Sequence, residues 1–122
     1  MSKRKKILII DDDVSFLESA EAVLKTKEFE VIKALDAESG IEALALEHPN
    51  IVLLDVNLPD KNGFEVLKTI KNSKDFSSLP VILITGDMAV QVDKGFAEGA
   101  DDVVFKPLDI GKLSLNINRL LK

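Results

Sequence analysis

Cysteine is absent from the 122-residue sequence, and histidine occurs only once, at His48. The absence of cysteine excludes a disulfide scaffold, thiol catalysis and cysteine metal ligands, and it suits a reducing compartment. With one histidine and no cysteine, nothing supports a transition-metal site. A chain of this length can bury about two-thirds of its unfolded surface. We therefore expect residues 1–122 to fold as one domain without disulfides or a structural metal.

The sequence also lacks an excess of positive charge and any long hydrophobic run. Its formal net charge of −5 argues against direct binding of nucleic acid, which usually requires a basic face. No apolar stretch approaches the ~18 residues of a membrane span. The basic start "MSKRKK" is followed only by "ILII", which is too short for the apolar region of a signal peptide. These features predict a soluble cytoplasmic protein that does not bind membranes.

Short β-rich runs alternate with amphipathic helical stretches along the chain. The runs predict strands at residues 6–10, 29–33, 51–54, 81–84 and 103–105. The strongest runs are continuously apolar, as is typical of strands covered on both faces. The stretches between them carry apolar residues at helical spacing, predicted to face the core: Leu17, Ala20, Leu24, Ile41, Leu44, Ala45, Phe64, Leu67, Ile70, Val92, Phe96, Ile110, Leu113, Ile117 and Leu120. The alternation predicts an α/β fold, with a five-stranded parallel sheet flanked by five helices.

Polar residues follow four of the five predicted strands. The carboxyl ends of parallel strands point the same way, and open α/β sheets bind ligands beyond those ends. One polar residue at a strand end could be chance, but four strands with such residues are a strong signal. In chain order, these residues are Asp11, Asp12, Asp13, Asp55, Thr85 and Lys106.

The residue types at this rim favour phosphoryl chemistry with a hard cation. Clustered carboxylates repel one another unless a cation neutralises them. Mg²⁺ fits, because it binds one or two protein carboxylates and completes its shell with water and phosphate oxygens. Asp55 is placed as a nucleophile, since carboxylates can form aspartyl phosphates. Thr85 and Lys106 could hold the phosphoryl oxygens by hydrogen bond and charge.

Taken together, the motifs resemble the receiver domain of two-component response regulators. The segments "ILIIDDD", "IVLLDVNLPDKNGFEVL", "VILITG", "GADD" and "FKP" follow in order within residues 5–121. The combination is specific, although each segment alone is weak. The resemblance implies a flavodoxin-like sheet with the strand order 2-1-3-4-5. It also implies that a histidine kinase or histidine phosphotransfer protein donates the phosphoryl group and that phosphorylation shifts the affinity for a downstream effector.

The resemblance also implies roles for individual residues. Asp55 would be the phosphoacceptor, and Asp11 and Asp12 would be the acidic pair that holds Mg²⁺ with it. Asn57 would offer its backbone carbonyl to the metal. Thr85 and Lys106 would contact the phosphoryl group, and the Lys106–Pro107 bond would be cis. Such a chain is a signalling phosphoacceptor that catalyses only its own phosphorylation and dephosphorylation, and not an enzyme acting on other substrates.

Three positions need separate expectations. Asp13 is expected to begin the first helix, where a carboxylate favours the positive helix end, with a direct or water-mediated metal role as the alternative. Val103 stands where the family usually has an aromatic residue, and it has too little volume for that residue's switching role. Switching should therefore rest on Thr85 and the loop 86–92. Phe105 is expected in the core.

Three other functions fit the sequence less well. "DDDVS" also fits the D-x-D pattern of haloacid-dehalogenase-type phosphatases, with Asp11 as nucleophile and Asp13 as acid, but that leaves Asp55 unexplained. A flavin- or nucleotide-binding module needs a phosphate-binding Gly-rich turn after the first strand, where this chain has three aspartates. A receiver-like module that binds without phosphorylation is disfavoured because all five key positions are filled.

Overall fold

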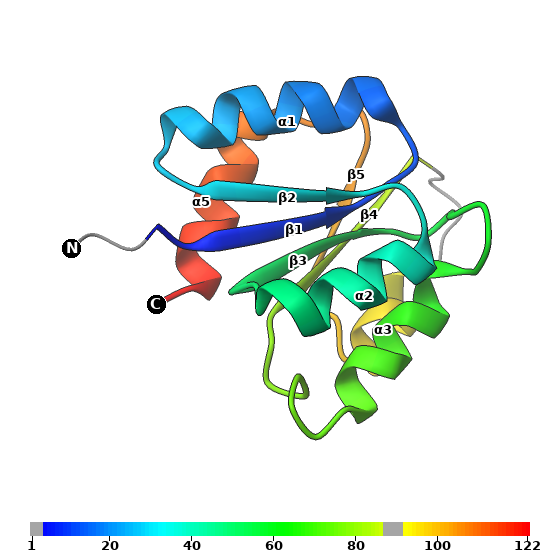
Figure 1. Cartoon of the computed structure of the whole chain (residues 1–122). Coiled ribbons are helices and arrows are strands. Elements are labelled where there is room, and N and C mark those ends of the chain that lie inside the picture. Colours follow the sequence, from blue (N-terminus) through cyan, green and yellow to red (C-terminus); the bar gives the residue numbers. More distant parts are fainter. Residues whose placement is uncertain (1–3, 87–91) are drawn as a thin grey trace.

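The computed structural model describes residues 4–86 and 92–122, which form one parallel β-sheet flanked by helices. All strand pairings within it are parallel, and Figure 1 shows the twisted sheet between two helical layers. The predicted order 2-1-3-4-5 is therefore confirmed. In spatial order the strands are β2 (Glu30–Ala34), β1 (Lys6–Ile10), β3 (Ile51–Asp55), β4 (Val81–Thr85) and β5 (Asp102–Phe105).

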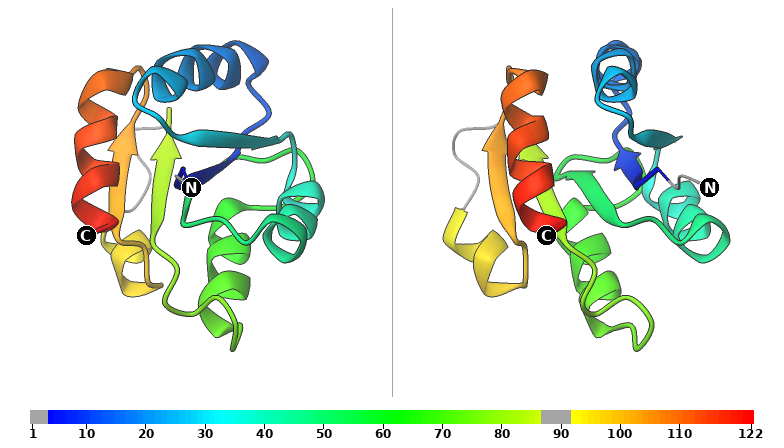
Figure 2. Two further views of the ribbon diagram at one scale, coloured as in Figure 1. Left: turned by 60° about the vertical axis from the view of Figure 1, so that its left-hand side comes forward. Right: turned by 90° about the vertical axis from the view of Figure 1, so that its left-hand side faces the viewer.

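The helices divide between the two faces of the sheet (Figure 2). On one face of the sheet, a hydrophobic cluster joins the strands to α1 (Val14–Thr26) and α5 (Ile110–Leu120). The cluster on the opposite face includes α2 (Ala37–Glu47) and α3 (Gly63–Asn72). The short helix α4 (Val92–Ala97) lies on this second face, where Gly95 approaches Leu83 and Val103. None of the helices in the described part of the chain is long and apolar enough to cross a membrane.

The central strands are apolar at nearly every position because both of their faces are covered. In β1, Ile7 and Ile9 pack toward α1 and α5, whereas Leu8 and Ile10 pack toward α2 and α3. All four side chains are completely buried. β3 and β4 are buried along their whole length in the same way. This burial confirms the strand prediction from continuous apolar runs, and it holds the carboxyl ends of β1, β3 and β4 rigidly side by side.

Polar N-cap residues set where the helices begin. Asp13, Asp36, Asn62 and Asp109 each accept a hydrogen bond from a first-turn N–H of α1, α2, α3 and α5, respectively. Such bonds satisfy N–H groups that have no partner within the helix. Gly99, with a φ of 106°, follows α4 in the left-handed conformation that glycine adopts readily after a helix.

Of the residues predicted to face the core, Ala45 and Phe96 are exposed, and Val92 and Phe105 are half-buried outside both core clusters. Ala45 is exposed because it follows Leu44, which occupies the sheet-facing position of α2. Phe96 is 47% exposed, since α4 turns the adjacent Gly95 toward the sheet instead. Phe105 is only half-buried and belongs to neither core cluster. It ends the edge strand β5, where no neighbouring strand covers its outer side.

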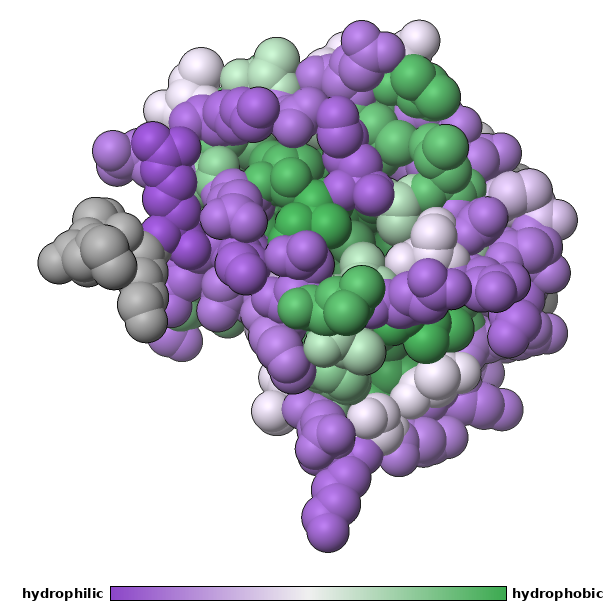
Figure 3. All heavy atoms as spheres, viewed as in Figure 1, coloured by the Kyte–Doolittle hydropathy of each residue, from purple (hydrophilic) through white to green (hydrophobic). Residues whose placement is uncertain are grey.

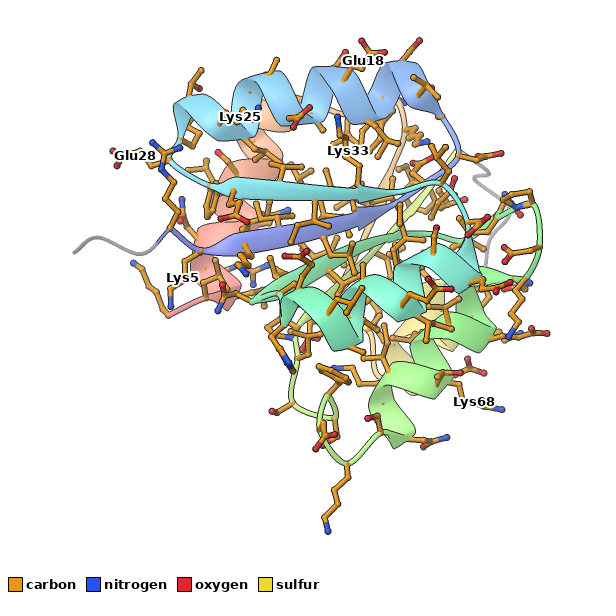
Figure 4. The ribbon with its side chains drawn as sticks, viewed as in Figure 1. Lys5, Glu18, Lys25, Glu28, Lys33 and Lys68 are labelled. Atoms are coloured by element: carbon orange, nitrogen blue, oxygen red, sulfur yellow. The ribbon has the colours of Figure 1, made fainter. Side chains whose placement is uncertain are left out.

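The other sheet edge is protected by charge. β2 is an edge strand, and its Lys33 reaches toward α1, as Figure 4 shows. Lys33 Nζ lies 2.7 Å from Glu21 Oε1, and Lys25 Nζ lies 3.3 Å from Glu21 Oε2. In Figure 3 hydrophilic residues surround the apolar groups visible on this face. Lysine on an edge strand disfavours pairing with a strand of another molecule.

We expect Gly63→Ala to destabilise the fold at the point where α3 meets β3. A Cβ atom at Gly63 would lie 2.7 Å from Val56 Cα and closer still to the carbonyl oxygen of Asp55. Overpacking of this kind costs about 1–3 kcal/mol of unfolding free energy, measurable by urea denaturation. Gly86→Ala is the matched control, because no atom of the described residues lies within 4 Å of its added Cβ. Equal stabilities of the two variants would contradict the prediction.

Candidate functional site

The carboxyl ends of the strands bring the predicted acidic residues together. Asp11 and Asp12 directly follow β1, and Asp55 is the last residue of the adjacent strand β3. One carboxylate oxygen of each residue lies within 4.8 Å of the others. Asp11 and Asp55 are buried, whereas Asp12 is exposed. The predicted convergence of these three carboxylates at one rim is therefore observed.

Asp11 carries an acceptor oxygen to which no residue in the described ranges donates a hydrogen bond. Its Oδ1 accepts the backbone N–H of Asp13 at 2.9 Å. Its Oδ2 is buried and accepts no hydrogen bond, although Lys106 Nζ lies 2.7 Å away. The contact with Lys106 is an ion pair between opposite charges. A buried acceptor of this kind fits a bound cation or water, because buried polar groups are otherwise hydrogen-bonded.

Lys106, the first residue after β5, brings a positive charge to these carboxylates. Besides Asp11, its Nζ lies 3.8 Å from Asp13 Oδ2 and 3.9 Å from Asp55 Oδ2. The Lys106–Pro107 peptide bond is cis, as the resemblance implied. One ammonium thus faces several carboxylates, and it cannot neutralise all of them.

Asp55 is a carboxylate in an environment that disfavours its negative charge. Its side chain is nearly buried, and this burial raises its pKa to about 6 from the ordinary value of 3.8. The N–H of Asn57 donates to Asp55 Oδ1 at 3.1 Å and opposes the rise in pKa. The nearby charge of Asp11 raises the pKa of Asp55 further, and the Lys106 ammonium lowers it. At neutral pH the carboxylate is ionised in a site that disfavours its charge.

Thr85 ends the strand next to that of Asp55, and Asn57 follows Asp55 by two residues. Thr85 is completely buried at the end of β4, the strand next to β3. Its carbonyl accepts the backbone N–H of Lys106 at 2.7 Å, which ties the ends of β4 and β5 together. Asn57 is exposed, two residues beyond the end of β3, and it bridges to Asn62 at the base of the loop.

The N-cap prediction for Asp13 is confirmed, whereas the switching expectation for Val103 stays a prediction. Asp13 is the N-cap of α1, and its Oδ1 accepts the N–H of Phe16 at 3.1 Å, as predicted. It does not belong to the cluster of three carboxylates. Val103 is half-buried and packs against the core beneath α4. Residues 87–91, which make up most of the predicted switching loop, lie outside the described residues.

The sequence interpretation missed two residues that contact the site or its loops. The Phe16 ring centroid lies 4.6 Å from Lys106 Nζ, a cation–π distance. Asp60 accepts the N–H groups of Ala37 and Glu38 at 2.8 and 3.0 Å, joining the loop after β3 to α2. Phe16 and Lys106 are ninety residues apart in the chain, so local sequence carries no signal for the first contact. Asp60 lies within the polar segment "NLPDKNG", whose length indicates a loop but not its neighbours.

The donor set fits a hard divalent cation. Three carboxylates lie together, one of them with a buried oxygen that accepts no hydrogen bond. The ligands are oxygen atoms, as Mg²⁺ prefers, and Asp12 faces solvent, so water can complete the shell. Asp11, Asp12 and Asp55 could therefore hold such an ion, with the Asn57 carbonyl nearby in sequence.

Comparison with known proteins identifies the class to which this fold and site belong. Residues 7–118 match the family model of the response regulator receiver domain. The chain therefore belongs to the response regulator receiver family. This assignment agrees with the resemblance derived from the sequence motifs, and it replaces the phosphatase and nucleotide-binding alternatives.

Particular relatives support the same assignment. The chain is 37% identical over 121 residues to a Cyanophora paradoxa protein named probable transcriptional regulator ycf27, and 35% identical over 119 residues to the cell cycle response regulator CtrA of Brucella ovis. These matches cover 98% and 96% of this chain but 49% and 50% of the relatives, so the chain spans about half their length. A CheY-like receiver domain structure from Methanospirillum hungatei superposes with a TM-score of 0.89 at 30% identity, covering 98% of this chain and 94% of that one.

We expect Asp55→Asn to stabilise the metal-free protein at neutral pH. Because the pKa of Asp55 is higher in the folded protein than in the unfolded chain, its contribution to stability is fully present below pH 3.8 and is lost as the pH rises through about 6. Asparagine has no charge to lose. The variant should gain about 1–3 kcal/mol of unfolding free energy at pH 7, at about 1.4 kcal/mol per pKa unit, and the gain should vanish near pH ~4.

Asp13→Ala is the control for this measurement. Asp13 is exposed and caps α1, so its removal should lower the unfolding free energy by about 0.5–2 kcal/mol. Denaturant titrations of the wild type and both variants in chelator-treated buffer supply the comparison. A gain for Asp55→Asn that is the same at pH ~4 and pH ~7 would rule out ionisation of Asp55 as its cause.

Proposed function

We propose that this chain is an Mg²⁺-dependent phosphoacceptor whose Asp55 receives a phosphoryl group from a phosphohistidine. The observation that carries the proposal is the arrangement around Asp55. A nearly buried carboxylate lies among two further carboxylates, with an ammonium 3.9 Å away. The membership of the chain in the receiver family supports the same function.

In the proposed reaction an Asp55 carboxylate oxygen forms a bond to phosphorus as the P–N bond of the donor breaks. The donor nitrogen keeps the bonding electron pair and takes up a proton, so that neutral histidine is released. Asp11, Asp12, Asp55 and the Asn57 carbonyl would hold Mg²⁺, which neutralises charge on the carboxylates and the phosphoryl oxygens when bound. Thr85 and Lys106 would bind phosphoryl oxygens by hydrogen bond and by charge.

The partners of this reaction follow from its chemistry. A histidine kinase or a histidine phosphotransfer protein would supply the phosphoryl group, in the reducing cytoplasm that a cysteine-free chain suits. The new charge at Asp55 would then shift the population of conformations that bind an effector. The relatives ycf27 and CtrA are named as regulators and are about twice as long. We infer that this chain likewise controls a downstream effector, without itself contacting nucleic acid.

Phosphorylation at Asp55 can be tested by intact mass. Incubation with a small phosphodonor and Mg²⁺ should add one phosphoryl group to the wild type and none to Asp55→Asn. Chelation of the metal should suppress the addition. Asp13→Asn is the matched control, because it keeps an acceptor for the α1 N-terminus and should be labelled like the wild type. Labelling of Asp55→Asn at the wild-type rate would refute the proposal, and loss of labelling in Asp13→Asn would favour the phosphatase arrangement.

Phe16 should assist the reaction through the position of Lys106. The ring lies 4.6 Å from the ammonium, and a cation–π contact at a half-exposed site contributes about 0.5–1 kcal/mol. Phe16→Leu should therefore slow phosphorylation by the small donor about twofold to fivefold. Phe16→Tyr retains an aromatic face and should react at nearly the wild-type rate. Equal rates for the leucine and tyrosine variants would show that the ring does not act on Lys106.

A further inference from the structure

Asp60 joins the loop that follows β3 to the first turn of α2. The loop, residues 56–62, connects Asp55 to α3, and it lies with the start of α2 at the same rim in Figure 1. Asp60 Oδ1 accepts the N–H of Ala37 at 2.8 Å, and Oδ2 accepts the N–H of Glu38 at 3.0 Å. One carboxylate thus uses both oxygens to bind an element more than twenty residues away.

Asp60 is the second carboxylate at this helix end. Asp36 is the N-cap of α2, and its Oδ1 accepts the N–H of Ser39 at 2.8 Å and the Ser39 hydroxyl at 2.6 Å. Asp36 therefore caps the helix from within, as N-caps usually do. The two bonds of Asp60 differ because they tie the helix to another element. The hydrogen bond from Ala37 is also the main reason that the pKa of Asp60 is lowered.

The rest of the loop is held at its base by backbone contacts and by Leu58, which packs against the hydrophobic core. Asn57 bridges to Asn62, and the N–H of Gly63 donates to the Val56 carbonyl at 2.6 Å. Gly63 also packs against the backbone of Asp55, where a Cβ atom would not fit. These contacts close the loop beside Asp55. The two hydrogen bonds of Asp60 join this loop to the backbone of α2.

We propose that Asp60 is a positioning residue that couples occupation of the metal site to the first turn of α2. The proposal rests on the proposed function, because Asn57, whose carbonyl would face the metal, is in the same closed loop. An ion that orders this loop holds Asp60 in place, and Asp60 in turn holds the N–H groups of Ala37 and Glu38. Coupling between two sites is reciprocal, so loosening the start of α2 from the loop must also weaken binding of the ion.

The first measurement is the affinity for Mg²⁺ without any phosphodonor. It is obtained from amide chemical shifts during an Mg²⁺ titration of the wild type, Asp60→Ala, Asp60→Asn and Asp36→Ala. Asp60→Ala should lose at least about fivefold in affinity, the lower end of typical coupling. Asp60→Asn retains one acceptor oxygen and should lie between Asp60→Ala and the wild type. Asp36→Ala removes the same charge and a cap from the same helix but leaves the loop attached, so it should stay close to the wild type.

The second measurement is hydrogen exchange at the Ala37 and Glu38 amides. Saturating Mg²⁺ should slow their exchange in the wild type and in Asp36→Ala. Mg²⁺ should leave the exchange of these amides unchanged in Asp60→Ala. This comparison reports on the coupling without any phosphorylation assay. Dispersed amide spectra establish that each variant is folded, and Asp60→Asn carries the test if the alanine variant unfolds.

The outcomes separate this inference from the function on which it rests. If the wild type fails to bind Mg²⁺, both are overturned. If the wild type binds but Asp60→Ala and Asp36→Ala lose the same affinity, the effect is one of charge or helix stability, and the coupling is refuted while the proposed function stands. Wild-type exchange rates that do not respond to Mg²⁺ would refute the coupling as well.

Discussion

Repulsion between the carboxylates of Asp11 and Asp55 is the constraint around which the rest of the site is arranged. Burial is the main cause of the raised pKa of Asp55, and the adjacent charge of Asp11 raises it further, because two buried acids side by side favour protonation of one of them. The carboxylates stay close because they end two adjacent strands whose apolar side chains fill both layers of the core. Packing of the central strands thus maintains a charge arrangement that the acids would not adopt in isolation.

Lys106 offsets part of this repulsion and leaves part of it in place. Its ammonium pairs with Asp11 at 2.7 Å but stays 3.9 Å from Asp55, so the Asp55 carboxylate is not held in a tight ion pair. The remaining negative charge and the buried Asp11 oxygen that accepts no hydrogen bond are suited to a divalent cation. The same features that destabilise the metal-free site therefore favour the cation binding and the phosphoryl transfer that the proposed function requires.

The fold and most of the site could be predicted because their signals are local in the sequence. Continuous apolar runs mark strands covered on both faces, and each run leads directly to its polar residue at the rim, as with Asp55 and Lys106. The errors arose where neighbours decide exposure. Phe96 follows a glycine that takes the sheet-facing position, and Phe105 ends an edge strand. Helical spacing and β-propensity cannot predict the exposure of Phe96 or Phe105, because the exposure of each side chain depends on which element packs nearby.

The sequence by itself determined the alternation of strands and helices, the residue types at each strand end and the N-caps of the helices, since these follow from periodicity and from bonds between near neighbours. Only the tertiary structure decided which distant groups meet. It set the distances from Lys106 to each carboxylate, put the Phe16 ring beside that ammonium and placed Asp60 on the first turn of α2. Such contacts depend on how strands and helices pack in three dimensions, and they cannot be predicted from the positions of the residues along the chain.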